Sequence, residues 1–277
     1  MLPRLESANH QPLLRMKFLL LFLLIPACVA SAADAAKKSA AKKEKPLTPG
    51  GIYRQGDMQR PRPTVITPPS APGQPPGDAI VLFDGRDLAK FKRVPPRGSS
   101  DASEIPQWKI ENGYAEITPK AGGISTRDKF GSSQIHLEWA TPAEVKGDSQ
   151  GRGNSGVLLE GWGEVQILDS FENDTYPDGQ AAAIYSNYPP LVNVCRKPGE
   201  WQSYDLICEC ATLDDQGKVL QPARLTVIHN GVVAQHAVAR PFTGQEFGFA
   251  LQDHNNPTRF RNIWVRPLHR YDENAKR

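Results

Sequence analysis

Short stretches in which apolar and polar residues alternate recur along the chain from residue 79 onward. Over 134–139 every second residue is apolar, so one face of this predicted strand belongs to a core and the other is polar. Asn-Gly pairs at 112–113 and 230–231 favour tight hairpin turns. Further strands are predicted over 80–83, 108–117, 204–211, 224–229, 232–239, 248–252 and 262–265.

No helical period of ten or more residues occurs in this part of the chain. Many short strands separated by turn residues are typical of an antiparallel β-sandwich or jelly roll. The region 79–268 is long enough for one such sandwich with a sizeable core. We therefore predict an all-β fold for 79–268, followed by a C-terminal tail over 269–277.

The N-terminal part has a different pattern. Met16-Lys17 precedes eight unbroken apolar residues, and Ala30-Ser-Ala32 resembles a cleavage site, which predicts a secretory signal peptide over 1–32. The apolar run is too short to span a bilayer, so we expect an exported periplasmic, envelope or secreted protein without a transmembrane span. The alternative is a lipid-modified Cys28, which Pro26 disfavours. Translation starts at Met1 or Met16.

Residues 33–78 are rich in lysine and alanine and then in proline. Such a segment buries little apolar surface, which predicts a disordered linker. The net charge of the chain is only +3, and the linker lysines account for it, so nothing indicates nucleic-acid binding. The linker could instead be the working part of an envelope structural protein.

Cysteines and glycines exclude some classes of site. After signal cleavage Cys195, Cys208 and Cys210 remain, and either a bridge from Cys195 to one of the others or three buried thiols fits the sequence. No C-x-x-C or H-x-x-x-H spacing indicates zinc. The G-x-G-x-x-G match at 151–156 follows a polar loop and precedes a strand, so it is not a dinucleotide site.

The segment 153–169 is predicted to form two short strands around a Gly-Trp-Gly turn. In a regular strand Glu164 and Gln166 share one face and Asp169 falls on the other, so one bulge is needed to bring all three together. Two carboxylates and an amide on an exposed sheet face suit carbohydrate chemistry, although a solvated polar face is the alternative. The spacing resembles the E-x-D-x-x-E strand of laminarinase-type β-glucanases, with an amide in the middle and a shorter acid last.

A second candidate cluster lies at 248–254. Alternation places Phe249 and Leu251 on the core side, and Gln252 and His254 on the other. His254 neighbours a carboxylate, so it is a candidate general base at neutral pH.

Four other residues are candidates for sugar binding. His136 and Glu138 lie on the polar face of the strand over 134–139, and Arg261 suits a hydroxyl or a carboxylate. Trp162, in the Gly-Trp-Gly turn, is either an exposed stacking platform for a sugar ring or a core aromatic.

Eight motifs occur in order: Leu82-Phe-Asp-Gly85, Asn154-Ser-Gly156, Glu164-Val-Gln166-Ile-Leu-Asp169, Ala183-Ile-Tyr185, Glu200-Trp201, Asn230-Gly231, Leu251-Gln-Asp-His254 and Phe260-Arg-Asn-Ile263. Together, over about Ala79 to Leu268, they resemble the 3-keto-disaccharide hydrolase domain family, which is common in exported bacterial proteins. The resemblance implies a concanavalin-like jelly roll. Gln202, where the family usually has Asn, and an insertion-like stretch over 172–180 depart from the family pattern and are expected near the site.

The resemblance also implies cleavage of sugars oxidised at C3, by removal of the C2 proton and loss of the C1 substituent, with net lyase or hydrolase outcome. His254 or Glu164 is then the expected base, Asp169 assists the leaving group, and Gln166, Gln252 and Arg261 hold the sugar. A divalent cation bound by some of Glu164, Asp169, Asp253 and His254 would also fit this chemistry. The alternative is a lectin-like module without catalysis.

Overall fold

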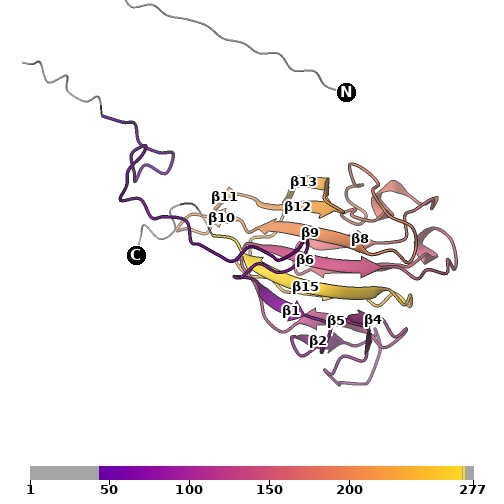
Figure 1. Cartoon of the computed structure of the whole chain (residues 1–277). Helices are drawn as coiled ribbons and strands as arrows, with labels where there is room; N and C mark the ends of the chain where they lie inside the picture. Colours follow the sequence, from indigo (N-terminus) through magenta and orange to yellow (C-terminus); the bar gives the residue numbers. More distant parts are fainter. Residues whose placement is uncertain (1–43, 270, 272–277) are drawn as a thin grey trace, which may run out of the picture.

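The computed structural model describes residues 44–269 and 271, and these form a two-layered β-sandwich (Figure 1). All strand pairs are antiparallel, and the described residues contain no α-helix, only the short 3-10 turns η1 (Ser149–Gly151) and η2 (Pro177–Gly179). The predicted antiparallel all-β fold is therefore confirmed. The signal peptide, Cys28 and most of the C-terminal tail lie outside the described residues.

One layer is an eight-stranded sheet, called here the large sheet. Its strands follow the order β13 (Val232–Arg240), β12 (Ala223–His229), β9 (Gln202–Glu209), β6 (Ser133–Ala140), β15 (Arg259–Pro267), β4 (Tyr114–Glu116) and β3 (Lys109–Glu111), with β1 (Ile80–Phe83) also paired to β15.

The other layer is a five-stranded sheet, called here the small sheet. Its order is β2 (Phe91–Val94), β5 (Gly123–Thr126), β14 (Phe249–Leu251), β7 (Ser155–Leu159) and β8 (Gly163–Ile167). A two-stranded ribbon of β10 (Thr212–Leu213) and β11 (Val219–Gln221) completes the described strands.

The core lies between the two sheets, and alternation along the strands builds it. Ile135, Leu137 and Trp139 of β6 are fully buried, as the pattern predicts. From the small sheet, Val165 of β8 and Leu251 of β14 face them in the same apolar cluster. Burying these side chains removes apolar surface from water, which stabilises the fold by about 25 cal/mol for each Å² buried. The polar positions between them consequently point to the two outer faces of the sandwich.

Both Asn-Gly pairs form hairpin turns, as predicted. Asn112 and Gly113 have φ of 49° and 77°, and Asn230 and Gly231 have φ of 50° and 81°. Positive φ at both central residues matches the twist of the flanking strands.

The three cysteines form no disulfide: Cys195 is partly buried, and Cys208 and Cys210 are buried thiols. The sequence left this choice open, and the structure selects the thiols. Within the described part of the chain, no helix has the length and apolarity needed to cross a bilayer.

The end of the segment predicted as a linker lies against the large sheet. Gly73 accepts hydrogen bonds from side chains of β15, and Asp78 pairs with Arg266 of the same strand. Whether residues 33–78 as a whole form a linker stays a prediction, but its last residues are docked.

Candidate active site

Strand pairing brings Glu164 and Gln166 onto the outer face of the small sheet. The two residues flank Val165, which is fully buried, so both side chains leave the strand on the opposite side. Glu164 of β8 pairs with Leu158 of β7, and Gln166 pairs with Gly156. The predicted common face of Glu164 and Gln166 is confirmed.

The next strand adds Gln252 to the same face. The Gln252 backbone N–H donates to Gly156 O at 3.0 Å, immediately after β14 ends. Gly156 therefore lies between two glutamines, Gln166 on one side and Gln252 on the other. Phe249 and Leu251 point into the core, as the alternation predicted.

Gly156 is what allows the Glu164 carboxylate to occupy its position. A Cβ built on Gly156 would overlap Glu164 Oε1 and lie 2.8 Å from its Cδ. The carboxylate thus rests directly over the bare backbone of β7. Any larger residue at position 156 would force it away.

Gln166 is buried, so its amide needs hydrogen-bond partners. With its nitrogen toward Glu164, it donates to Glu164 Oε1 and to Ser155 O, both at 3.1 Å, whereas the reverse orientation sets its oxygen against these acceptors. Gln252 Oε1 is buried with no hydrogen-bond partner among the described residues. It is an acceptor that a ligand hydroxyl would satisfy.

Two hollows extend the site across the small sheet. One has a volume of about 300 Å³ and includes Gln252 and Asp253, and the other has about 420 Å³ and includes Ser125. Both are lined by Leu158 and Ala250, which are cross-strand partners. Leu158 also pairs with Glu164 in the β7–β8 ladder.

Burial sets the electrostatics of Glu164. Loss of hydration disfavours the charged form and raises the pKa of Glu164 to about 7. No ion pair to Glu164 is found in the described part of the chain to reverse this effect. At neutral pH the carboxyl group is therefore divided between its two protonation states, which suits a general base.

Two tyrosines stand beside this carboxylate. Tyr185 N donates to Glu164 O at 3.0 Å, and the neighbouring Ile184 bridges Val165, so Tyr185 lies directly across from Glu164. The Tyr185 and Tyr176 hydroxyls are 2.6 Å apart. Burial, this hydrogen bond and nearby negative charge raise the pKa of Tyr176 to about 12. The phenol of Tyr176 is thus neutral at physiological pH.

Sequence reasoning did not select either tyrosine. Tyr185 ends one of the motifs that carried the family resemblance, and Tyr176 lies in the stretch over 172–180 flagged as insertion-like. That stretch does approach the site, as expected. The two tyrosines reach the site because 184–185 pair with the edge of β8, and no local sequence pattern reveals that pairing.

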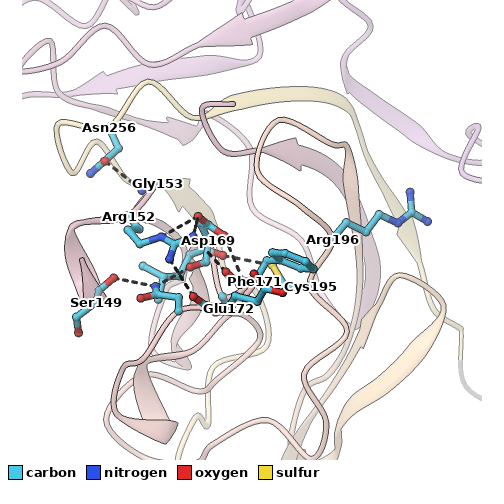
Figure 2. A network of polar contacts seen from close by, with 12 residues as sticks. Ser149, Arg152, Gly153, Asp169, Phe171, Glu172, Cys195, Arg196 and Asn256 are labelled. Carbon is cyan, nitrogen blue, oxygen red and sulfur yellow. Dashed lines mark hydrogen bonds and ion pairs between the residues drawn. The ribbon is translucent and has the colours of Figure 1, made fainter. Parts of the chain in front are cut away.

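Asp169 lies two residues beyond the end of β8, away from this face. Its carboxylate is 3% exposed and accepts from Arg152 Nε at 2.9 Å, while its Oδ1 accepts from Phe171 N (Figure 2). The β7–β8 register runs without a shift over its whole length. The role of Asp169 in assisting the leaving group stays a prediction, and its observed contacts are with Arg152 and the following turn.

His254 is exposed and follows β14 by three residues. Its neighbour Asp253 accepts from Gly122 N at 3.0 Å and Asn255 N at 2.8 Å. Within residues 44–269 and 271, no group of three His, Cys, Asp or Glu side chains is placed to hold a metal ion, and Glu164, Asp169, Asp253 and His254 do not form such a group.

The expectation that Trp162 is an exposed stacking platform is wrong. Its side chain is fully buried, with ring centroids 5.1 Å from Phe242 and 5.2 Å from Phe247. The tight turn, with Gly161 and Gly163 at positive φ, directs the indole inward, where it buries a large apolar area.

His136, Glu138 and Arg261 do gather, but on the outer face of the large sheet, on the other side of the sandwich. Arg261 Nε lies 2.6 Å from Glu138 Oε2. Gln202 is in the large sheet too, where its Oε1 accepts from Arg196 N and Asn230 Nδ2. These residues are therefore not part of the Glu164 site.

Comparison with known proteins agrees with this description. A candidate glycosyl hydrolase from Parabacteroides distasonis is 37% identical, with a TM-score of 0.67, over 80% of this chain and all of that one. A second from the same organism is 18% identical, with a TM-score of 0.50, over 69% of this chain and 94% of that one, which shows the fold alone. No curated protein matches the sequence. The family profile of the 3-keto-alpha-glucoside-1,2-lyase-like domain matches residues 78–266, and the chain belongs to this family of carbohydrate-active domains.

Proposed function

We propose that this protein cleaves 3-keto-glycosides by eliminating the substituent at C1, with Glu164 as the base that removes the C2 proton. The observation that carries the proposal is the half-buried Glu164 carboxyl group, which lies over Gly156, accepts from Gln166 and has its pKa raised to about 7. A lectin-like site needs no carboxyl group tuned in this way.

The ketone at C3 makes the C2 proton acidic. Glu164 takes this proton, the C2–H electrons form an enediolate with the C3 oxygen, and this collapses to a C1–C2 double bond as the C1–O bond breaks. The leaving oxygen then receives a proton. The product is an unsaturated keto-sugar, and addition of water across the double bond makes the net reaction a hydrolysis.

The surrounding side chains supply the remaining roles. The unsatisfied Gln252 Oε1 accepts from a sugar hydroxyl, and the buried Gln166 holds the Glu164 carboxylate in place. Tyr185 lies opposite Glu164, and its hydroxyl is hydrogen-bonded to that of Tyr176. It donates a proton to the leaving oxygen. His254, exposed beyond β14, is the alternative base. Asp169, paired with Arg152, is the alternative group to assist the leaving oxygen.

The test uses a 3-keto-glucoside with a chromophoric aglycone, and measures both aglycone release and exchange of the C2 proton with deuterated solvent. Glu164→Gln should abolish both, and His254→Ala should retain exchange. The matched control is Glu246→Gln, since Glu246 is an exposed carboxylate that precedes β14 of the same sheet and lines neither hollow.

Two results would contradict the proposal. Solvent exchange at C2 that survives in Glu164→Gln but is lost in His254→Ala would move the base to His254. If the wild type neither releases the aglycone nor exchanges the C2 proton of any keto-sugar, the protein is a binding domain and not an enzyme of this kind.

A further inference from the structure

The outer face of the large sheet holds a cavity of about 840 Å³ that the Glu164 chemistry does not use. Its floor is formed by alternate residues of β6 and β9, including His136, Glu138 and Asp205. The proline-rich segment over 69–76 forms one wall, and it runs along the sheet before β1 (Figure 1). The volume lies within the range of known ligand sites.

The wall formed by this segment is fixed to the sheet. Gly73 O accepts from Asn262 Nδ2 at 2.7 Å and from Trp264 Nε1 at 2.9 Å, and Asp78 pairs with Arg266 at 2.9 Å. A bulge makes this possible: Asn262 has φ of 49°, and the β15–β6 register shifts between Arg261 and Trp264. Without the shift, Trp264 would point into the core.

The floor of the cavity carries a buried positive charge. Burial alone would lower the pKa of His136, but Asp205, 3.0 Å from its Nδ1, and Glu138 outweigh it and raise this pKa to about 9. The ring is therefore cationic at neutral pH, although it is 2% exposed. Its Nε2 has no hydrogen-bond partner in the described structure and lies 3.9 Å from Glu138 Oε1. This buried donor lies beneath the wall, because a Cβ on Gly73 would be 3.3 Å from Nε2.

Positive charge exceeds negative charge along the lining. His136, Arg261 and Arg266 each face a carboxylate. The guanidinium of Arg196, the fourth lining cation, faces no carboxylate in the described structure and donates from Nη1 to Trp201 O at 3.0 Å. Figure 2 shows its side chain pointing away from the Asp169 cluster.

Trp201 contacts both this arginine, through its backbone oxygen, and a second arginine, Arg261, through its ring. The Arg261 guanidinium lies 4.1 Å from the Trp201 ring centroid, and its hydrogen bond to Glu138 uses only Nε. A carboxylate entering the cavity would meet nitrogen donors from Arg196 and Arg261, which form strong charge-assisted hydrogen bonds with carboxylates.

We propose that this cavity is a second binding site, for an oligosaccharide that carries carboxylate groups, on the opposite side of the sandwich from Glu164. Arg196 and Arg261 take the carboxylates. Asp205 and Ser203 accept from sugar hydroxyls, and the prolines of the 69–76 wall pack against the apolar faces of the sugar rings.

The test measures binding of tetragalacturonate by calorimetry to the full chain, with maltotetraose as the neutral probe. The wild type should bind the acidic tetramer and not the neutral one, and added salt should weaken the binding. Arg196→Met should weaken it by about tenfold, the effect of one charge-assisted hydrogen bond. The matched control is Arg224→Met, because Arg224 is an exposed arginine on β12 of the same sheet but outside the cavity.

Glu164→Gln separates this proposal from the proposed function, because it should leave tetragalacturonate binding unchanged. Equal binding of the two tetramers, no binding by the wild type, or unchanged binding by Arg196→Met would overturn the second site. Loss of binding in Glu164→Gln would place the acidic sugar in the small-sheet site and would also overturn it.

Discussion

Replacing Gly156 by alanine tests whether the position of the Glu164 carboxylate determines its chemistry. The added methyl carbon would overlap Oε1 and lie 2.8 Å from Cδ and 3.0 Å from Cγ, so three atoms of the glutamate must move. Since the backbone of β7 is held by β8 and β14 on both sides, the side chain must rotate toward solvent.

The size of the effect follows from burial. Moving the carboxylate into water restores its hydration, so the pKa of Glu164 should return from about 7 toward the ordinary value of 4.5. The base is then weaker and misplaced, and we expect kcat to fall by about 10²–10³, within the usual contribution of a general base. The pH at which activity reaches half its maximum should fall in parallel.

The assay is the pH dependence of kcat on a 3-keto-glucoside, with Gly151→Ala as the control. A Cβ on Gly151 meets nothing within 4 Å, so this variant makes the same chemical change without displacing any atom. If Gly156→Ala keeps both the wild-type rate and the wild-type pH profile, the carboxylate over β7 is not the base.

Three further predictions concern charge and protonation. The raised pKa of Glu164 makes the folded state bind a proton that the unfolded chain releases, so wild-type stability should fall as pH rises from about 4.5 to 7, by up to about 3 kcal/mol, and urea unfolding of Glu164→Gln should lack this slope. The raised pKa of His136 gives stability that is complete below pH 6.5 and lost as pH rises through about 9; His136→Gln should remove this loss in thermal unfolding, and a slope that persists would show that other groups cause it. Tyr185→Phe should slow cleavage of alkyl glycosides by about 10² and of nitrophenyl glycosides far less, because a good leaving group needs no proton; equal slowing of both would exclude Tyr185 as the acid.

The sequence predicted the sandwich because its signal is local. Alternation along 134–139 and the two Asn-Gly turns depend only on neighbouring residues, and the structure reproduces them. The shared face of Glu164 and Gln166 follows from the same period of two.

The distribution of residues between the two faces could not be predicted in this way. His136, Arg261 and Gln252 all occupy polar positions beside apolar ones, so the local pattern does not distinguish them. The sheet to which each strand belongs depends on long-range pairing. Trp162 shows a related limit, since its turn fits both exposure and burial, and the presence of Phe242 and Phe247 decides between them.

The three thiols have a consequence for how the protein holds together. With no covalent cross-link among Cys195, Cys208 and Cys210, the stability of the sandwich rests on packing, hydrogen bonds and ion pairs. Burial raises the pKa of the Cys195 thiol to about 11 and that of Cys208 further still, so neither forms the reactive thiolate at neutral pH. Because the described cysteines form no disulfide, reducing agents should leave the melting temperature of the folded domain unchanged.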